Sequence, residues 1–337
     1  MAHPDIFVIG GGPAGLAVAI AARRKGLSVT VADGNRPPID KACGEGLMPN
    51  CLAAAAKIGI DIPAEAGFEI RGIRFHGAGH AVEADFPVSR GLGVRRTVLH
   101  RVLLETAERA GVEFRWGTPV SGLHEIDARW IVGADGSSSR VRRWAGLDSY
   151  VRNTHRFTYR QHYALSPWTG FVEVHWAEGC QIYITPTASN EVGIALISRE
   201  QRLRVDEAVQ RFPAVGARLR GVPVTSRGRG AITAMMRLRN VTHGNVALIG
   251  DASGSVDAIT GEGLCLAFKQ AAVLADAMAR GDLSEYARLH PRLARRPTAM
   301  AHAMLLLDTG PRVRGSGFRA LSAAPWLFEK LLRFHVS

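Results

Sequence analysis

Three glycines near the start of the chain have the spacing of a phosphate-binding turn. Gly10, Gly12 and Gly15 form a G-x-G-x-x-G pattern directly after the apolar run at 6–9. The first glycine permits a tight turn, the second lets the backbone approach a pyrophosphate, and the third allows close packing of a helix on a strand. Asp33 is placed to accept hydrogen bonds from a ribose diol. The pattern predicts a dinucleotide site, does not distinguish NAD from FAD, and leaves open a turn that serves packing alone.

The same tripeptide occurs at two distant points of the chain. The stretches KACGEGLMPN (41–50) and DAITGEGLCLAF (257–268) each carry Gly-Glu-Gly beside a cysteine. Glycine lets backbone N–H groups approach a ligand without obstruction by a side chain. Glu45 and Glu262 are open to a role in such a site, to solvent exposure or to helix capping. Cys43 is interpreted as a small packing residue rather than a redox partner.

The elements that must position these residues alternate between strand and helix. A helix is predicted over 16–24, Gly26 ends it, and 28–33 reads as a second strand. Further along, the strand at 130–132 leads to Asp135, and the strand at 246–249 leads to Asp251. Ligands bind at the carboxyl ends of strands in open α/β sheets, although each aspartate taken alone also reads as a helix cap or turn.

In this order and spacing, the three motifs resemble those of the FAD-dependent hydroxylase superfamily that shares the para-hydroxybenzoate hydroxylase fold. The resemblance covers nearly the whole chain and implies FAD as the cofactor. It implies that the glycine turn holds the pyrophosphate, Asp33 the adenosine ribose, and Asp251 the ribityl or pyrophosphate portion. Asp135 would support the pyrophosphate region, and the backbone of Val120 would meet the adenine. The full set of implied cofactor residues is Gly10, Gly12, Pro13, Ala14, Gly15, Asp33, Gly34, Cys43, Gly44, Arg96, Val120, Asp135, Gly136, Gly250, Asp251, Gly261, Gly263 and Leu264.

Two features point to one branch of that superfamily. Aromatic hydroxylases usually carry a Pro-Pro pair before the glycine turn at the flavin, where this chain has Ala258 and Ile259. The segments ITGEGL and ACGEGL look more like the corresponding segments of the geranylgeranyl reductase branch. The resemblance implies that both Gly-Glu-Gly turns lie beside the isoalloxazine, with the helix near Gly261 directed at its N1–C2=O edge. The Trp-rich signature of the halogenase branch is not found.

The segment 156–198 alternates strongly and is rich in Tyr, Trp, Val and Ile. It predicts a four-stranded antiparallel meander that a hairpin at 71–86 joins. The resemblance implies that this sheet roofs the flavin, with one face toward the cavity, but the alternation does not say which face. Because a Gly-Ala-Gly turn separates His76 from His80, we expect a hairpin there and no metal site. The candidate substrate-lining residues are Tyr159, Gln161, Tyr163, Trp176 and Tyr183.

The fold class follows from these elements. We predict an α/β protein with a Rossmann-type FAD-binding domain, an inserted antiparallel β-sheet substrate domain and C-terminal helices. The apolar stripe of the last helix, Trp326, Leu327, Leu331 and Phe334, is interpreted as core or cavity lid rather than membrane anchor. The predicted FAD-binding domain comprises 1–70, 91–150 and 235–290, the substrate domain 71–90 and 151–234, and the helices 291–337.

Charge and composition limit the partners. The net charge of +12 comes almost wholly from dispersed arginines, without long basic runs or interleaved aromatics, so we expect no nucleic-acid partner. Contact with the surface of a membrane is left open. The four cysteines lack CxxC or metal-type spacing, and no apolar run reaches the roughly 18 residues of a spanning helix. We expect a cytoplasmic protein, with peripheral attachment to a membrane as the open alternative.

The resemblance implies an FAD-dependent oxidoreductase that receives electrons from NAD(P)H or from a separate flavin reductase. The first hypothesis is a monooxygenase that uses O2, through a flavin C4a-hydroperoxide, on an apolar, aromatic or polyketide-like small molecule. The alternative is a reductase of an isoprenoid-type C=C bond, and a third hypothesis is a flavin-binding scaffold without turnover. No catalytic acid or base stands out in the sequence, as is usual where the cofactor carries the chemistry.

Overall fold

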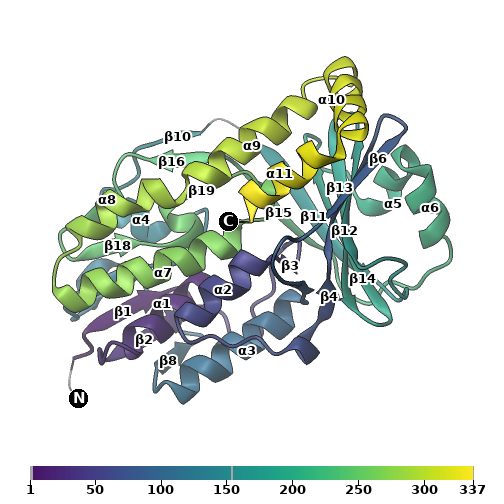
Figure 1. Ribbon diagram of the computed structural model, residues 1–337. Coiled ribbons are helices and arrows are strands. Elements are labelled where there is room, and N and C mark those ends of the chain that lie inside the picture. The colour runs from purple at the N-terminus through teal and green to yellow at the C-terminus, as the bar shows by residue number, and fades with distance from the viewer. Residues whose placement is uncertain (1–2, 153–154, 337) are drawn as a thin grey trace.

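The computed structural model describes residues 3–152 and 155–336. Two large β-sheets stand side by side, and the last helices of the chain reach across from one to the other (Figure 1). The predicted fold class is confirmed, with a parallel sheet, a mostly antiparallel second sheet and C-terminal helices.

The first sheet, here called the cofactor sheet, is parallel except at one edge. Its strand β1 (Ile6–Ile9) is buried along its whole length and pairs in parallel with β2 (Val29–Asp33) and β9 (Trp130–Gly133). Strands covered on both faces are continuously apolar, which explains the run IFVI. The order is β17 (Thr242–His243), β18 (Val246–Leu248), β9, β1, β2 and β8 (Glu113–Trp116).

Helices pack around the cofactor sheet. The Ala-rich α1 (Pro13–Arg23) buries nearly all of its residues, and its small side chains let α7 (Gly263–Arg280) lie against it. Gly281 ends α7 in the left-handed conformation that glycine adopts without strain. The remaining helices of this part are α2 (Pro49–Lys57), α3 (Arg96–Arg109), α4 (Arg140–Trp144) and α8 (Ser284–Leu293).

The second sheet, here called the roof sheet, corrects the predicted meander. Strand β11 (Arg156–Tyr163) pairs with β14 (Glu191–Ser198) and not with its sequence neighbour β12 (Phe171–Ala177). Strand β12 instead lies parallel to β5 (Gly72–Gly77), which belongs to the predicted hairpin. The order is β15 (Arg229–Thr233), β11, β14, β13 (Cys180–Ala188), β12, β5 and β6 (His80–Asp85).

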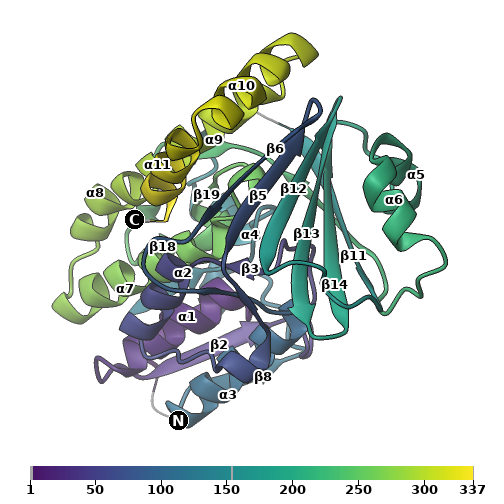
Figure 2. The same ribbon diagram turned by 45° about the vertical axis from the view of Figure 1, so that its right-hand side comes forward.

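Both faces of the roof sheet are covered. Helices α5 (Val205–Ala208) and α6 (Pro213–Leu219) pack on the face turned away from the cofactor sheet (Figure 2). The other face packs against the C-terminal helices α9 (Arg295–Leu307), α10 (Pro311–Ala323) and α11 (Pro325–His335). Since each face carries an apolar core, polar–apolar alternation could not show which face meets the cavity.

Two small sheets connect the large ones. Strands β3 (Gly46–Leu47), β7 (Gly91–Gly93) and β4 (Phe68–Ile70) form one, and β10 (Tyr150–Arg152), β16 (Met236–Leu238) and β19 (Gly254–Ser255) form the other. They lie where the chain passes between the two large sheets. Among the described residues, no helix combines the length and the hydropathy needed to cross a membrane.

Candidate cofactor and substrate site

A cavity of about 560 Å3 lies where the cofactor sheet, the roof sheet and the C-terminal helices meet. Both Gly-Glu-Gly turns line it, with 41–48 on one side and Gly261 and Gly263 on the other. The repeated tripeptide therefore belongs to one site. The predicted cofactor residues in the lining are Gly12, Pro13, Ala14, Cys43, Gly44, Arg96, Gly136, Gly250, Asp251, Gly261, Gly263 and Leu264.

The glycines of the turn after β1 have two roles, because some pack against the neighbouring backbone and one borders the cavity. A Cβ on Gly15 would lie 1.9 Å from the carbonyl oxygen of Gly10, and a Cβ on Gly10 would lie 2.4 Å from that of Ala134. Both positions therefore hold the turn against its neighbours and lie outside the lining. Gly12 differs, since a Cβ there would meet no atom of the described chain within 4 Å. Gly12 leaves the space at the N-terminus of α1 open to a ligand.

Asp33 ends β2 beside this turn. Its carboxylate accepts hydrogen bonds from the backbone N–H of Gly11 at 2.8 Å and of Asn35 at 2.8 Å. The carbonyl oxygen of Gly11 in turn lies 2.9 Å from Nε2 of buried His100, a residue that the sequence did not indicate. Asp33 and the predicted residues Gly34 and Val120 lie outside the cavity lining.

Asp135 has the local role that was left open for it. Its carboxylate accepts hydrogen bonds from the Ser139 hydroxyl and from the backbone N–H groups of Arg140 and Val141. It thus satisfies the first N–H groups of α4, beside the N-cap residue Ser139. The side chain is thus turned away from the cavity, and the segment 136–138 lines the cavity instead.

Asp251 faces the cavity from the end of β18. Protein atoms surround the cavity, and this burial raises the pKa of Asp251, opposed by the charges of Lys41 and Arg96. Arg96 stands at the start of α3, and its guanidinium Nε finds no hydrogen-bond partner among the described residues. A buried donor without a partner is costly, so an anionic group of a ligand is the expected acceptor.

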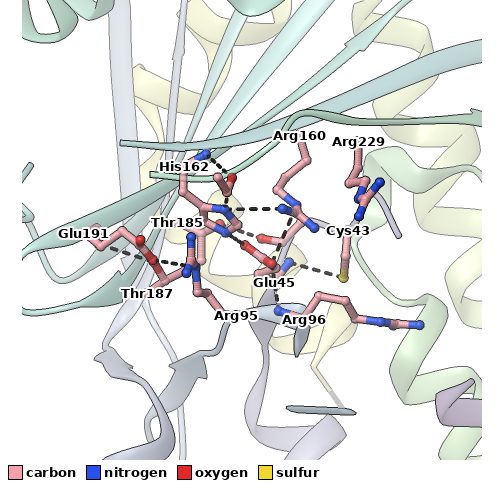
Figure 3. Close-up of polar contacts among 12 residues, drawn as sticks. Cys43, Glu45, Arg95, Arg96, Arg160, His162, Thr185, Thr187, Glu191 and Arg229 are labelled. Carbon is pink, nitrogen blue, oxygen red and sulfur yellow. Dashed lines mark hydrogen bonds and ion pairs between the residues drawn. The ribbon is translucent and has the colours of Figure 1, made fainter. Parts of the chain in front are cut away.

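The first Gly-Glu-Gly turn is clamped to the roof sheet through Glu45 (Figure 3). Glu45 has a φ of 61° and is 3% exposed. Its carboxylate accepts a hydrogen bond from the backbone N–H of Arg96 at 2.7 Å and lies 2.6 Å from Nε2 of His162. Arg160 Nε adds positive charge at 3.7 Å. The buried carboxylate is therefore surrounded by hydrogen-bond donors and positive charge.

Other contacts fix the shape of this turn. The Thr185 hydroxyl donates to the carbonyl oxygen of Gly44 at 2.7 Å, and the backbone N–H of Glu45 donates to Sγ of Cys43 at 3.4 Å. Burial raises the pKa of the Cys43 thiol, so the thiol is neutral at neutral pH. A neutral thiol is a weak nucleophile, in agreement with a packing role.

The second Gly-Glu-Gly turn opens α7. Gly261 has a φ of 68°, and the preceding turn is closed by the Asp257 carboxylate, which accepts from the backbone N–H of Ile259 at 3.0 Å. Helix α7 begins at Gly263, and its first residues line the cavity. The free N–H groups and the positive end of the helix dipole therefore point into the site.

The roof contributes two of the five residues predicted to line the cavity. Tyr159 and Tyr183 belong to the lining, and the Tyr183 hydroxyl donates to the carbonyl oxygen of Ile259 at 2.6 Å. Gln161, Tyr163 and Trp176 do not line the cavity. The Tyr163 ring is buried in the core beneath α5 and α6, with its hydroxyl 3.3 Å from the Gln161 side chain. Trp176 is covered by Phe75 and Phe318.

Besides Tyr159, the opposite face of β11 also meets the cavity region. Thr158 and Arg160 line the cavity, and His162 contacts Glu45. A strand with two buried faces gives no signal in its own sequence for this choice. The contact between β11 and the first Gly-Glu-Gly turn, which lies far away in the sequence, determines which side chains of β11 face the cavity region.

Beyond the polar walls the cavity becomes apolar. Its outer part is formed by side chains of the roof sheet and the C-terminal helices, with His335 as the polar exception on α11. Of the predicted stripe on α11, Leu331 lines the cavity, whereas Trp326 and Phe334 are exposed. The apolar lining comprises Ile70, Ile73, Phe75, Phe86, Val172, Val174, Met300, Met304, Leu307, Leu321, Phe328, Leu331 and Leu332.

The sequence did not indicate a second polar cluster, on the far face of the roof sheet. His76 and His175 stack at 4.2 Å, and Glu173 lies 3.2 Å from Nε2 of His175. Arg74 pairs with Glu173 at 3.0 Å, and the indole N–H of Trp168 donates to it at 3.2 Å. The charge of Glu173 is thus already compensated. His80, which the sequence analysis did not expect to share a metal site with His76, lies on the neighbouring strand β6.

The walls of the cavity fit FAD. Gly12, Gly44, Gly261 and Gly263 each face space in which a Cβ would meet no described atom within 4 Å. The N-termini of α1 and α7, with Lys41 and Arg96, offer positive potential to phosphate and to a reduced flavin ring. A flat, anionic, elongated ligand can lie against these glycines without steric obstruction.

Comparison with known proteins agrees with this fit. A family model described as an FAD binding domain matches residues 3–282. Menaquinone reductase of Mycobacterium tuberculosis (strain ATCC 25618 / H37Rv) is 28% identical over 91% of this chain and 85% of its own length. Digeranylgeranylglycerophospholipid reductase 1 of Methanococcoides burtonii is 26% identical over 83% of this chain and 76% of its own.

A solved structure shares the fold. The p-nitrophenol 4-monooxygenase PnpA of Pseudomonas putida DLL-E4 superimposes with a TM-score of 0.81 at 18% identity, covering 98% of this chain and 96% of that one. At this identity the likeness concerns the fold and not the reaction. With the family match over most of its length, the chain belongs to the FAD-binding domain family and is an FAD-dependent oxidoreductase.

Proposed function

We propose that this protein is an FAD-dependent reductase that adds hydrogen across an isoprenoid-type C=C bond of an apolar small molecule. The observation that carries the proposal is the apolar outer part of the cavity, which adjoins the wall formed by both Gly-Glu-Gly turns. Aliphatic and aromatic side chains without a charged group suit a polyprenyl chain. The curated relatives support the same choice, since both carry the name of a reductase.

This proposal reverses the preference drawn from the sequence, which placed a monooxygenase first. The likeness to PnpA does not restore that preference, because it shows the fold alone. Oxygen transfer remains the second candidate, since a cavity that excludes water also protects an oxygenating flavin. The two reactions differ in their products, which an experiment can separate.

The chain's own residues would serve the cofactor and the substrate in distinct ways. When bound and reduced, FAD supplies a hydride. Lys41 and Arg96 would neutralise its phosphates, and the N-terminus of α7 would stabilise negative charge on the ring. The roof sheet and α11 would hold the alkene against the ring and exclude water. NAD(P)H is the proposed electron donor, with a separate flavin reductase as the other source.

The test uses the purified protein loaded with FAD. The flavin is reduced with dithionite without oxygen, and geranylgeraniol is added as an isoprenoid probe. Return of the oxidised flavin spectrum, with a product that has gained a hydrogen pair, supports the reductase. Reoxidation by O2 alone, with a product that has gained an oxygen atom, would establish the monooxygenase instead. A protein that cannot be loaded with FAD would overturn both.

A further inference from the structure

The second Gly-Glu-Gly turn holds a buried carboxyl group with few partners. Glu262 is 4% exposed, and its Oε1 receives only a long contact of 3.5 Å from the side-chain amide of Asn50. Its Oε2 has no hydrogen-bond partner within the described chain. Nδ1 of His335 lies 3.6 Å from Oε2 and also lacks a hydrogen-bond partner within the described chain. Two orphaned polar atoms thus face each other behind the cavity wall.

The other nitrogen of the His335 ring decides where a proton can sit. Nε2 lies 3.1 Å from the carbonyl oxygen of Thr260, and a carbonyl can only accept. Nε2 therefore carries hydrogen, and in the neutral ring Nδ1 is an acceptor. An ionised Glu262 would then face another acceptor. The pair is complementary only when one proton lies between Oε2 and Nδ1.

The two Gly-Glu-Gly turns differ in this respect. The carboxylate of Glu45 is contacted closely by the N–H of Arg96 and by His162, with the guanidinium of Arg160 nearby. Glu262 has no such donors. The repeated tripeptide therefore places two carboxyl groups in different surroundings beside the same cavity, one with close donors and one without them.

The groups around Glu262 and His335 on the neighbouring elements are consistent with a protonated Glu262. Asn50 and Cys51 face Glu262 from α2, and Cys265 and Lys269 face it from α7. Burial raises the pKa of Glu262 to about 7, opposed by Lys269 and Asn50. Burial lowers the pKa of His335 to about 4, with Lys269 acting in the same direction. The shared proton therefore resides on Glu262 below about pH 7.

We propose that Glu262 and His335 form a proton relay into the cavity, with His335 as the cavity-lining catalytic residue and Glu262 as the positioned proton store behind it. His335 lines the cavity together with Gly261 and Gly263, and Glu262 does not. This inference rests on the proposed reduction of a C=C bond, because that reaction consumes a proton as well as a hydride.

The relay balances the reaction. One alkene carbon would take the hydride with its electron pair, and the π bond would break. The other carbon would take the proton from Nε2 of His335, which would give up its hydrogen bond to the carbonyl oxygen of Thr260. The proton of Glu262 moves to Nδ1, so the ring stays neutral and Glu262 becomes a carboxylate. The two electrons would come from the reduced cofactor. A proton from solvent would then return to Nε2, while the proton on Nδ1 returns to Glu262.

The proton store can be tested without any substrate. Infrared spectra of the FAD-loaded protein are recorded as a pH series for the wild type and Glu262→Gln. We expect a protonated carboxyl band in the wild type that disappears near pH 7 and is missing from the variant. Wild-type protein with isotope-labelled glutamate tests the same point if the variant does not fold. A Glu262 carboxyl that is fully ionised well below pH 7 would overturn the inference.

The delivery step is tested with geranylgeraniol in the anaerobic assay. We expect the wild-type rate to fall as the pH rises through about 7. Glu262→Gln should be at least about tenfold slower and lose this pH dependence, and His335→Phe should be slowed similarly. The control Glu329→Gln, an exposed carboxyl on the same helix as His335, should keep the wild-type profile.

The outcomes separate the two proposals. If reduction occurs and both variants retain the wild-type rate and profile, the relay is wrong while the reductase stands. If no isoprenoid is reduced, the proposed function fails and the delivery step fails with it. The infrared titration then decides alone whether Glu262 stores a proton.

Discussion

Oε2 of Glu45 lies 2.6 Å from Nε2 of His162, and this contact joins the first Gly-Glu-Gly turn to strand β11 of the roof sheet. Both side chains are almost completely buried. The Ser226 hydroxyl lies 2.7 Å from the other ring nitrogen of His162, so the ring is held from both sides. The turn is held against the roof by this carboxylate and its donors, together with the hydrogen bond from Thr185 to Gly44.

Glu45→Gln should therefore destabilise the folded protein. The amide removes the carboxylate that faces His162 and the backbone N–H of Arg96 in a buried site, at a cost of about 3 kcal/mol, whereas Arg160 keeps its ion pair with Asp40. Urea denaturation of the apoprotein measures the change in the free energy of unfolding. As a control, Asp85→Asn breaks the exposed pair between Asp85 and Arg71 and should cost less than about 1 kcal/mol. Equal costs for the two variants would contradict the clamp.

Gly12→Val should weaken FAD binding without disturbing the fold. The backbone of Gly12 has a φ of −73°, which valine adopts, and the new side chain would enter space that no described atom occupies. We expect at least about a tenfold rise in the Kd of FAD, or roughly 1.4 kcal/mol. The apoprotein should melt as the wild type does. Fluorescence titration with FAD and thermal melting of the apoprotein measure the two effects.

Gly15→Ala provides the matched comparison. A Cβ at this position would lie 1.9 Å from the carbonyl oxygen of Gly10, so the turn must shift. Here we expect the apoprotein itself to lose stability, and FAD affinity to fall as a consequence. If Gly12→Val destabilised the apoprotein as much as Gly15→Ala does, the open space at Gly12 would not be a ligand site.

The stability of the protein should depend on pH through Glu262. Its pKa is raised from 4.5 to about 7 in the folded protein, so its contribution is present below pH 4.5 and is lost as the pH rises through 7. The loss is on the order of 3 kcal/mol. Glu262→Gln removes the titrating group. Relative to the wild type, the variant should gain stability across this window in urea unfolding experiments.

The contribution of His335 to stability depends on pH in the opposite direction. Its pKa is lowered from 6.5 to about 4, so its contribution is present above pH 6.5 and is lost as the pH falls through 4. Between about pH 4.5 and 6.5 the two contributions oppose each other in the wild type, so the test is the difference in stability between the wild type and Glu262→Gln. A difference that does not change from pH 4.5 to 7 would show that Glu262 ionises normally.

Val174→Phe should impair turnover of a long substrate and leave the cofactor in place. Val174 is 2% exposed and lines the apolar part of the cavity, so a larger side chain reduces the room for a polyprenyl chain. We expect a higher KM for geranylgeraniol, of about tenfold, and unchanged FAD content. The matched control is Val313→Phe on α10, where the side chain is largely exposed. A variant with normal KM would place the substrate elsewhere.

The sequence predicted the parts of the site whose cause is local. The glycine turn after β1 follows from spacing, because Gly10 and Gly15 contact backbone within the same turn or the adjacent strand. The two Gly-Glu-Gly turns could be assigned to one site because the same tripeptide occurs in both. Asp135 was ambiguous, since a cap and a ligand contact use the same position after a strand, and only the geometry separates them.

The residues that the sequence missed act across distant segments. His162 and His335 are single histidines whose partners, Glu45 and Glu262, come from other elements. Nothing in the neighbouring residues of either histidine marks it. The order of the roof strands was wrong for the same reason, because β12 finds its second partner in β5, which a different part of the chain supplies.

Pairing of β5 with β12 places Gly72 beside Phe171, 99 positions later in the chain. The chain must close this long loop before the roof sheet is complete, and the entropy lost in closing it is not offset until the strands meet. Such contacts form late in folding and slow it. The cavity has walls from both large sheets, so it exists only after that step. We therefore expect bound FAD to slow the unfolding of this protein far more than it accelerates its folding.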